Sequence, residues 1–198
     1  MADQPIVPGD AHLREETLTS ELVYKGHFLE LRRDVVRLPT GREAPREYVI
    51  HPGAVMIVAT LPDGRLVMER QYRYPVRQTM IEFPAGKLDA GEDPWLCAQR
   101  ELMEETGYRA REWAKAGVLH PVIAYSTEVI EIWFARDLTL GERQLDSEEF
   151  LDVFTATPDE LLAWCQQGLV TDAKTLTGAL WLQNVLSGGW PLTWQSAS

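Results

Sequence analysis

The sequence of 198 residues has few cysteines and no long apolar run. Its two cysteines, Cys97 and Cys165, lie far apart and match neither a zinc-site nor a disulfide spacing, so we expect free thiols in a reducing compartment. No apolar stretch approaches the ~20 residues of a membrane-spanning helix, and the N-terminal sequence MADQPIVPGD is polar, unlike a signal peptide. Together these absences predict a cytoplasmic protein that does not enter a membrane.

Positive charge is also scarce. The chain has 19 Lys and Arg against 30 Asp and Glu, which gives a formal net charge of −11. Such an acidic chain is not expected to bind nucleic acid by general electrostatic attraction. An anionic substrate would have to be attracted locally, by a bound metal ion or by a few arginines. The hydrophobic content of 45% is enough for a core, and the length allows one ordinary domain with at most a small appendage.

The apolar patterns predict a strand-rich chain with helices interposed. Residues 21–39 alternate in polarity, with a turn at Lys25-Gly26, whereas residues 54–61 form a continuous apolar run that suits a strand buried on both faces. Residues 62–64 predict a hairpin turn. The other expected elements are strands at 46–50, 65–73, 117–123 and 128–138, an extended segment at 79–88, and helices at 94–105, 157–168 and 172–186.

This order of elements predicts an α+β fold with a mixed β-sheet and a small N-terminal antiparallel β module. The turn-forming sequence His51-Pro52-Gly53 marks the expected boundary. We therefore assign residues 1–50 to an N-terminal arm and β module, and residues 51–198 to the main domain.

The helix expected at residues 94–105 carries a cluster of negative charge. Glu101 and Glu105 lie four residues apart on one helical face, and Glu104 lies beside them. Like charges at this spacing, near the C-terminal end of a helix, are unfavourable. The cluster is either a solvated acidic face partly balanced by Arg100 or the carboxylate set of a Mg²⁺ or Mn²⁺ site, since hard oxygen ligands suit these ions. The side expected to pack on the sheet contains Trp95, Ala98, Gln99, Leu102 and Thr106.

The loop before this helix decides between the two interpretations. The sequence PAGKLDAGE leads into the helix, and the whole unit from Gly86 to Tyr108 resembles the Nudix box position for position. The matching residues are Gly86, Glu92, Arg100, Glu101, Leu102, Glu104, Glu105, Gly107 and Tyr108. Only Tyr108 departs from the usual aliphatic residue, and it remains hydrophobic.

The resemblance implies a Nudix hydrolase, which cleaves a nucleoside diphosphate linked to another moiety. It implies a fold with a mixed sheet between helices and a site for Mg²⁺ or Mn²⁺. Arg100 would orient the carboxylates, and Glu92 would pair or ligate from the loop. The implied metal ligands are the Ala85 carbonyl, Glu101, Glu104 and Glu105.

Beyond the box, the sequence is similar to ADP-ribose pyrophosphatases, in which a small β module exchanges across a homodimer. The similar segments include RQYRYPV and IEFPAGKLDAGE. The substrate-binding residues implied by this resemblance are Arg46, Glu47, Arg73, Glu82 and Glu128. Arg46 and Glu47 are also compatible with an ordinary exposed strand.

One segment departs from that subfamily, so the sugar moiety stays open. In VIAYSTE, residues 122–128, Ile123 and Ala124 replace a usual Pro and Gly. ADP-ribose is the expected substrate, with AMP and ribose 5-phosphate as products. Another nucleotide sugar or a dinucleotide is the alternative substrate, and a nucleotide-sugar sensor without catalysis is the alternative class.

The catalytic base is expected outside the box. In the subfamily it is carried by an acidic loop before the penultimate strand, and LDSEEFLDVF, residues 145–154, resembles that loop. Glu149 fits the pattern best, and Glu148 is the fallback. The other interpretation of this loop is a solvated turn.

Overall fold

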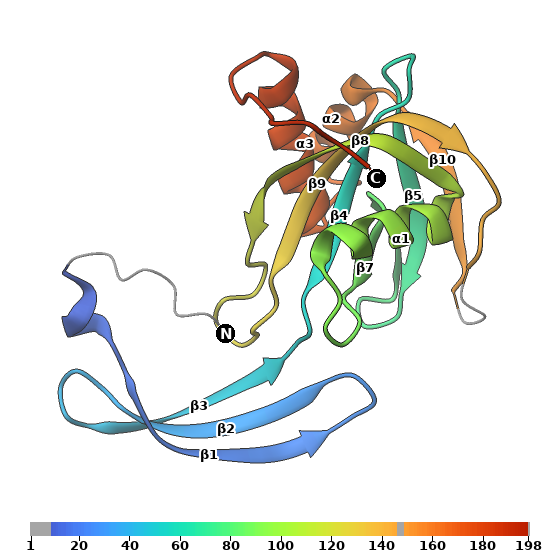
Figure 1. Cartoon of the computed structure of the whole chain (residues 1–198). Helices are drawn as coiled ribbons and strands as arrows, with labels where there is room; N and C mark the ends of the chain where they lie inside the picture. Colours follow the sequence, from blue (N-terminus) through green and yellow to red (C-terminus); the bar gives the residue numbers. More distant parts are fainter. Residues whose placement is uncertain (1–8, 146–148, 198) are drawn as a thin grey trace. The chain divides into compact units, whose positions relative to one another are not determined.

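The structure is a computed structural model that describes residues 9–145 and 149–197. Its elements follow the alternation of strands and helices seen in the sequence (Figure 1). They are a 3-10 helix at Asp10–Leu13, β1 (Glu16–Lys25), β2 (Glu30–Arg37), β3 (Glu43–Ile50), β4 (Ala54–Ala59), β5 (Leu66–Arg73), β6 (Gln78–Glu82), β7 (Ala85–Lys87), α1 (Pro94–Thr106), β8 (Tyr108–Leu119), β9 (Ile130–Leu140), β10 (Leu151–Ala156), α2 (Pro158–Gln166), α3 (Ala173–Leu186) and β11 (Gln195–Ser196). None of the helices within the described ranges is long and apolar enough to cross a membrane.

The chain divides into two compact units. The smaller unit extends to His51 and also contains the segment Val122–Glu128. Its antiparallel sheet has the order β1-β2-β3, and the added segment joins β3 where the Val49 amide donates a hydrogen bond of 2.9 Å to the Tyr125 carbonyl. The predicted strand at residues 117–123 is wrong in its second half, because β8 ends at Leu119 and a turn follows.

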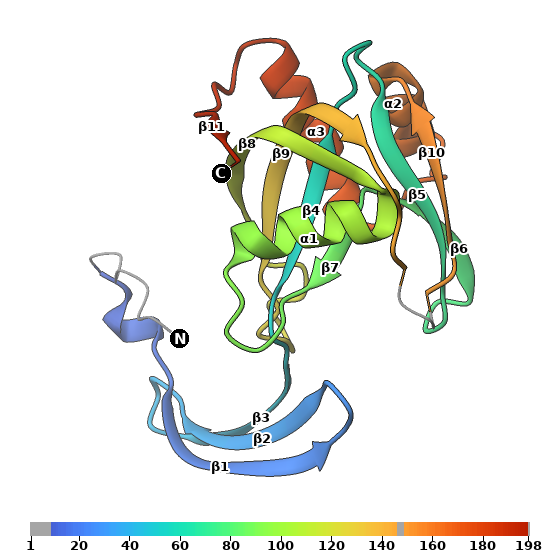
Figure 2. The ribbon, with the colours of Figure 1, turned by 45° about the vertical axis from the view of Figure 1, so that its right-hand side comes forward.

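The larger unit contains two sheets. A five-stranded sheet has the order β11-β8-β9-β4-β7, and a three-stranded antiparallel sheet has the order β10-β5-β6. Strands β4 and β9 are parallel, whereas the other pairs are antiparallel, so the larger sheet is mixed. The predicted α+β fold with a mixed sheet between helices is confirmed. Figure 2 shows α1 lying along the five-stranded sheet.

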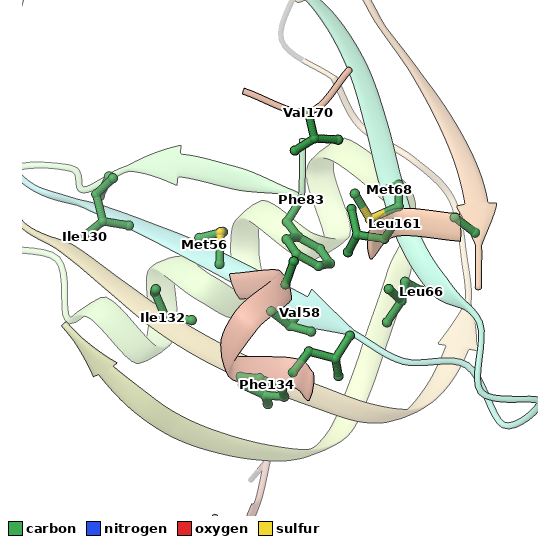
Figure 3. Packing of buried hydrophobic residues seen from close by; sticks show 14 residues of the cluster. Met56, Val58, Leu66, Met68, Phe83, Ile130, Ile132, Phe134, Leu161 and Val170 are labelled. Atoms are coloured by element: carbon green, nitrogen blue, oxygen red, sulfur yellow. The ribbon is translucent and has the colours of Figure 1, made fainter. Parts of the chain in front are cut away.

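Strand β4 explains why two layers of helices are needed. All six of its residues are buried, and alternate side chains enter two separate clusters. Met56 and Val58 pack with Phe83, Leu161 and residues of α3 on one face (Figure 3). The odd-numbered residues of β4 pack on the other face against α1, whose contribution is Cys97, Ala98 and Leu102.

The turn at residues 62–64 forms as predicted, but it does not make a full hairpin. The Gly64 amide donates a hydrogen bond of 2.9 Å to the Leu61 carbonyl. Beyond the single bridge between Thr60 and Leu66, however, β4 and β5 enter different sheets. After this divergence, β5 and β6 form a separate sheet with β10.

Candidate active site

The loop–helix unit is fixed at both ends by local backbone chemistry. Strand β7 pairs with β4, and the Asp93 side chain caps α1 by accepting a hydrogen bond of 2.9 Å from the Trp95 amide. The helix ends at Gly107, whose φ of 77° is in the left-handed region that favours glycine. The predicted helix from Pro94 to Glu105 is therefore confirmed to within one residue.

Gly86 allows the helix to approach the loop. A Cβ atom built at Gly86 would lie 1.8 Å from Cδ of Glu101 and about as close to both carboxylate oxygens. The carboxylate of Glu101 thus occupies the space that any other residue at position 86 would fill. This contact explains physically why the motif needs glycine here.

Arg100 connects three carboxylates of the loop–helix unit. Its guanidinium donates hydrogen bonds of 2.8 Å to each oxygen of Glu92, of 2.8 Å to Glu101 and of 3.0 Å to Glu104. The hydrogen bonds from Arg100 lower the pKa of Glu92 to about 2. Glu92 therefore holds the loop to the helix through its ion pair with Arg100. This contact favours a structural role for Glu92 over a role as a metal ligand.

Glu101 and Glu105 are buried, although the sequence placed them on a separate face from the packing side. Burial raises the pKa of Glu101 to about 7 despite its contact with Arg100. Burial and repulsion from neighbouring carboxylates raise the pKa of Glu105 well above its ordinary value. One oxygen of Glu105 accepts a hydrogen bond of 3.0 Å from the Ala85 amide, so helix and loop hold the carboxylate together.

A further buried carboxylate, which the sequence analysis missed, comes from β5. Glu69 pairs directly across the ladder with Glu82 of β6, and both side chains are almost fully buried. Burial, followed by repulsion from Glu82, raises the pKa of Glu69 to about 8. The available signal was a glutamate that directly follows the apolar run of Leu66, Val67 and Met68, all of which are buried.

The two members of this carboxylate pair have different surroundings. Glu82 accepts hydrogen bonds of 2.7 and 2.8 Å from Arg73, and it is also ion-paired with Lys174 at the start of α3. Burial alone raises the pKa of Glu82, but these cations outweigh it and the net pKa is lowered. Arg73 and Glu82, both predicted site residues, are thus brought together, and Lys174 joins them.

The predicted base lies near this cluster. The negative charge of Glu149 contributes to the raised pKa values of Glu101 and Glu105, which places it within electrostatic reach of both. Its loop is attached nearby, because the Gln144 amide donates a hydrogen bond of 3.1 Å to the Glu104 carbonyl. Glu148, the fallback, lies outside the described residues.

Three predicted substrate-binding residues belong to the smaller unit instead. Arg46 is ion-paired with Glu15, and Glu47 accepts a hydrogen bond of 2.9 Å from Arg33. Glu128 lies 3.8 Å from the His51 ring, measured from Oε1 to Nε2. Their roles toward a substrate stay predictions.

The chemistry of the cluster fits a divalent cation. Within the described residues, no three His, Cys, Asp or Glu side chains are already arranged as a metal site. Glu69, Glu101 and Glu105 are nevertheless all buried, Glu105 is repelled by both of the others, and Oε1 of Glu69 has no hydrogen-bond partner among the described residues. Burying carboxylates in this way is costly unless a cation compensates them, and oxygen ligands suit hard divalent ions.

Comparison with known proteins agrees with this chemistry. The NUDIX domain family matches residues 50–176, and the nucleoside diphosphate sugar hydrolase N-terminal domain family matches residues 15–49. An ADP-ribose pyrophosphatase from Bacillus subtilis (strain 168) is 37% identical, over 86% of this chain and 94% of its own length. A methanol dehydrogenase activator from Bacillus methanolicus is 38% identical, over 85% of this chain and 92% of its own length.

A solved structure shows the same fold. The crystal structure of an ADP compounds hydrolase superposes with a TM-score of 0.80 at 22% identity, covering 89% of this chain and 96% of the other. Nudix hydrolases generally use divalent metal ions, and the carboxylate oxygens of this site are of the type that such ions prefer. The match over most of the chain, together with the intact loop–helix unit, makes this protein a member of the Nudix hydrolase family.

Proposed function

We propose that this Nudix hydrolase cleaves ADP-ribose with water, using Mg²⁺ or Mn²⁺, to give AMP and ribose 5-phosphate. The observation that carries the proposal is the burial of Glu101 and Glu105, which raises the pKa of both carboxyl groups even though Arg100 is ion-paired with Glu101. The similarity to an ADP-ribose pyrophosphatase over nearly the whole chain supports this substrate.

Each part of the site has a distinct task in this proposal. Glu101, Glu105, Glu104 and the Ala85 carbonyl would hold the cation, which would neutralise the diphosphate and make water a better nucleophile. Arg100 fixes the carboxylate geometry through its contacts with Glu92, Glu101 and Glu104. Arg73 is already paired with Glu82, so it would present the remaining donors of its guanidinium to the phosphates.

The base is assigned to Glu149. Its carboxylate would accept the proton of the attacking water, because the box glutamates are committed to the cation and less basic beside it. Support comes from the proximity of its charge to Glu101 and Glu105. Glu148 remains the alternative base.

We also propose a homodimer in which the smaller unit contacts a second copy of the chain. Between residues 9 and 51 only Asp34 and Val36 are buried, whereas several large apolar side chains are exposed. Such a small sheet needs a partner surface to be stable. Arg46 and Glu47 would then contact the substrate bound by the partner copy.

A substrate panel tests the proposed activity. Purified protein would be incubated with Mg²⁺ and ADP-ribose, other nucleotide sugars and dinucleotides, with products resolved by chromatography. We expect AMP and ribose 5-phosphate from ADP-ribose, loss of turnover in excess chelator, and little turnover by Glu105→Gln. Preference for another nucleotide sugar would overturn the substrate assignment. Binding of ADP-ribose without cleavage of any compound would identify a sensor instead.

A further inference from the structure

Glu69 is a carboxylate in the core of the larger unit with an oxygen that has no hydrogen-bond partner. Its exposed fraction is 3%, and Oε1 is buried without a partner among the described residues. Glu69 is on β5, outside the loop–helix unit that defines the family motif. A buried carboxylate in this state costs several kcal/mol in the folded protein unless a charge compensates it.

Among the described residues, the neighbour of Glu69 has ion pairs that Glu69 itself lacks. Glu82, directly opposite in the ladder, is equally buried and has ion pairs with both Arg73 and Lys174. No ion pair to Glu69 is found in the described part of the chain, although its charge is felt by Glu105. The pair is therefore asymmetric: one carboxylate has two ion pairs, whereas the other has none among the described residues and is repelled electrostatically by Glu105.

The nearby cations have other partners. Arg73 uses its Nε and Nη2 on Glu82, and Arg143 donates a hydrogen bond of 2.8 Å to the Leu151 carbonyl. Arg100 is shared by three carboxylates of the loop–helix unit. None of these cations is ion-paired with Glu69 in the described ranges, so a bound cation could compensate this carboxylate when it is ionised.

We propose that Glu69 is an additional carboxylate ligand of the divalent cation, contributed by β5 to the site formed by Glu101 and Glu105. The inference rests on the proposed function, because it assigns a further residue to the same metal site. The unpartnered Oε1 of Glu69 is the donor atom. Because β5 diverges from β4 after the turn at residues 62–64, Glu69 lies in a different sheet from β4 and β7.

Direct metal binding tests this assignment independently of turnover. Mn²⁺ would be titrated into the full-length wild type and the Glu69→Gln variant, with affinity and stoichiometry followed by calorimetry and by the electron paramagnetic resonance of free Mn²⁺. We expect Glu69→Gln to weaken binding by about 10- to 100-fold or to lose one bound Mn²⁺ per chain. The isosteric amide keeps the size of the side chain, so packing is preserved.

Two further variants make the comparison specific. Glu131→Gln is the matched control, since Glu131 is a partly buried carboxylate of β9 that is ion-paired with Lys115 away from the cluster, and its Mn²⁺ affinity should equal that of the wild type. If Glu69→Gln does not fold, Glu69→Asp keeps the charge and shortens the side chain. The same weakening is expected for that variant.

The outcomes separate this inference from the proposed function. Equal Mn²⁺ affinity and stoichiometry in wild type and Glu69→Gln would overturn the role of Glu69, while hydrolysis of ADP-ribose by the wild type would leave the function intact. A wild type that binds Mn²⁺ through Glu69 but cleaves no compound of the panel would overturn the function alone. Absence of Mn²⁺ binding to the wild type would overturn both.

Discussion

Gly86 and Glu101 occupy a single space: a Cβ atom at position 86 would lie 1.8 Å from the Cδ atom of the glutamate. Gly86→Ala should therefore keep the fold, because the backbone at this position is not in the left-handed region, but it should displace the Glu101 carboxylate. We expect a loss of about 10²-fold in kcat/KM, the scale of a 1 Å misplacement in a catalytic site. Steady-state kinetics and a Mn²⁺ titration measure the effect.

The control for this variant is Gly189→Ala, since a Cβ atom there meets its nearest neighbour at 3.6 Å and fits without displacement. Wild-type kinetics in Gly86→Ala would contradict the steric argument.

Arg100→Lys should disconnect the loop from the helix while keeping the charge. A lysine cannot reproduce the paired hydrogen bonds to Glu92 together with those to Glu101 and Glu104. We expect about a 10- to 100-fold loss of activity and faster amide hydrogen exchange at residues 89–92. Arg111→Lys, at an exposed ion pair with Asp137, is the control and should change neither quantity. Unchanged exchange in Arg100→Lys would show that the loop does not depend on this residue.

The base assignment is tested by comparing Glu149→Gln with Glu148→Gln on ADP-ribose at saturating Mg²⁺. Removal of the base should lower kcat by roughly 10²–10⁴-fold with little change in KM. Glu149 is expected to show this loss because its charge already lies near Glu101 and Glu105. If both variants keep near wild-type kcat, the base lies elsewhere, with Glu128 or a box glutamate next to be examined.

The homodimer proposal is tested by mixing two inactive variants. If each active site takes its carboxylates from one chain and Arg46 from the other, an equal mixture of Arg46→Ala and Glu105→Gln chains should regain activity. Random reassortment would restore about one quarter of the sites. No recovery after reassortment would indicate that each chain serves its own site. Light scattering provides an independent check, since a monomer that stays active without residues 1–48 would refute the proposal.

Without metal, stability should fall as pH rises. The folded-state pKa values of Glu69 and Glu101, about 8 and about 7, lie above the ordinary value of 4.5. These groups therefore favour the folded state fully below about pH 4.5, and this contribution is lost as pH rises through 7 to 8. In excess chelator, Glu69→Gln should gain stability over the wild type progressively between pH 5 and pH 8.

Thermal unfolding measures this difference, and each 1 kcal/mol corresponds to ~2–4 °C in Tm for a chain of this size. A Tm difference that is constant with pH would contradict the assignment of a raised pKa to Glu69. Addition of Mn²⁺ should reduce the difference at pH 8, because the cation stabilises the wild-type carboxylates.

The sequence was most informative where structure depends on neighbouring residues. The capping Asp93, the following proline and the terminal Gly107 define α1 almost to the residue, and Thr157 with Glu160 forms the capping box that begins α2. The uniform apolar run of β4 correctly predicted burial on both faces. The spacing from Gly86 to Tyr108 was sufficient to identify the Nudix hydrolase family.

Contacts between segments that are far apart in the chain could not be predicted from the sequence. The helical projection separated Glu101 from the packing side, yet the close approach of Gly86 buries its carboxylate. Residues 121–123 resembled a strand, but the segment from Val122 joins β3 instead.

By itself, therefore, the sequence determined the loop–helix unit, its four glutamates and the class of chemistry, because caps, turns and helical spacing act over a few residues. Only the tertiary structure decided that β4 and β5 enter different sheets and that Glu69 lies opposite a Glu82 neutralised by Arg73 and Lys174. Burial and charge compensation are set by residues far apart in the chain, and these two quantities distinguish a solvated glutamate from a buried one with a raised pKa.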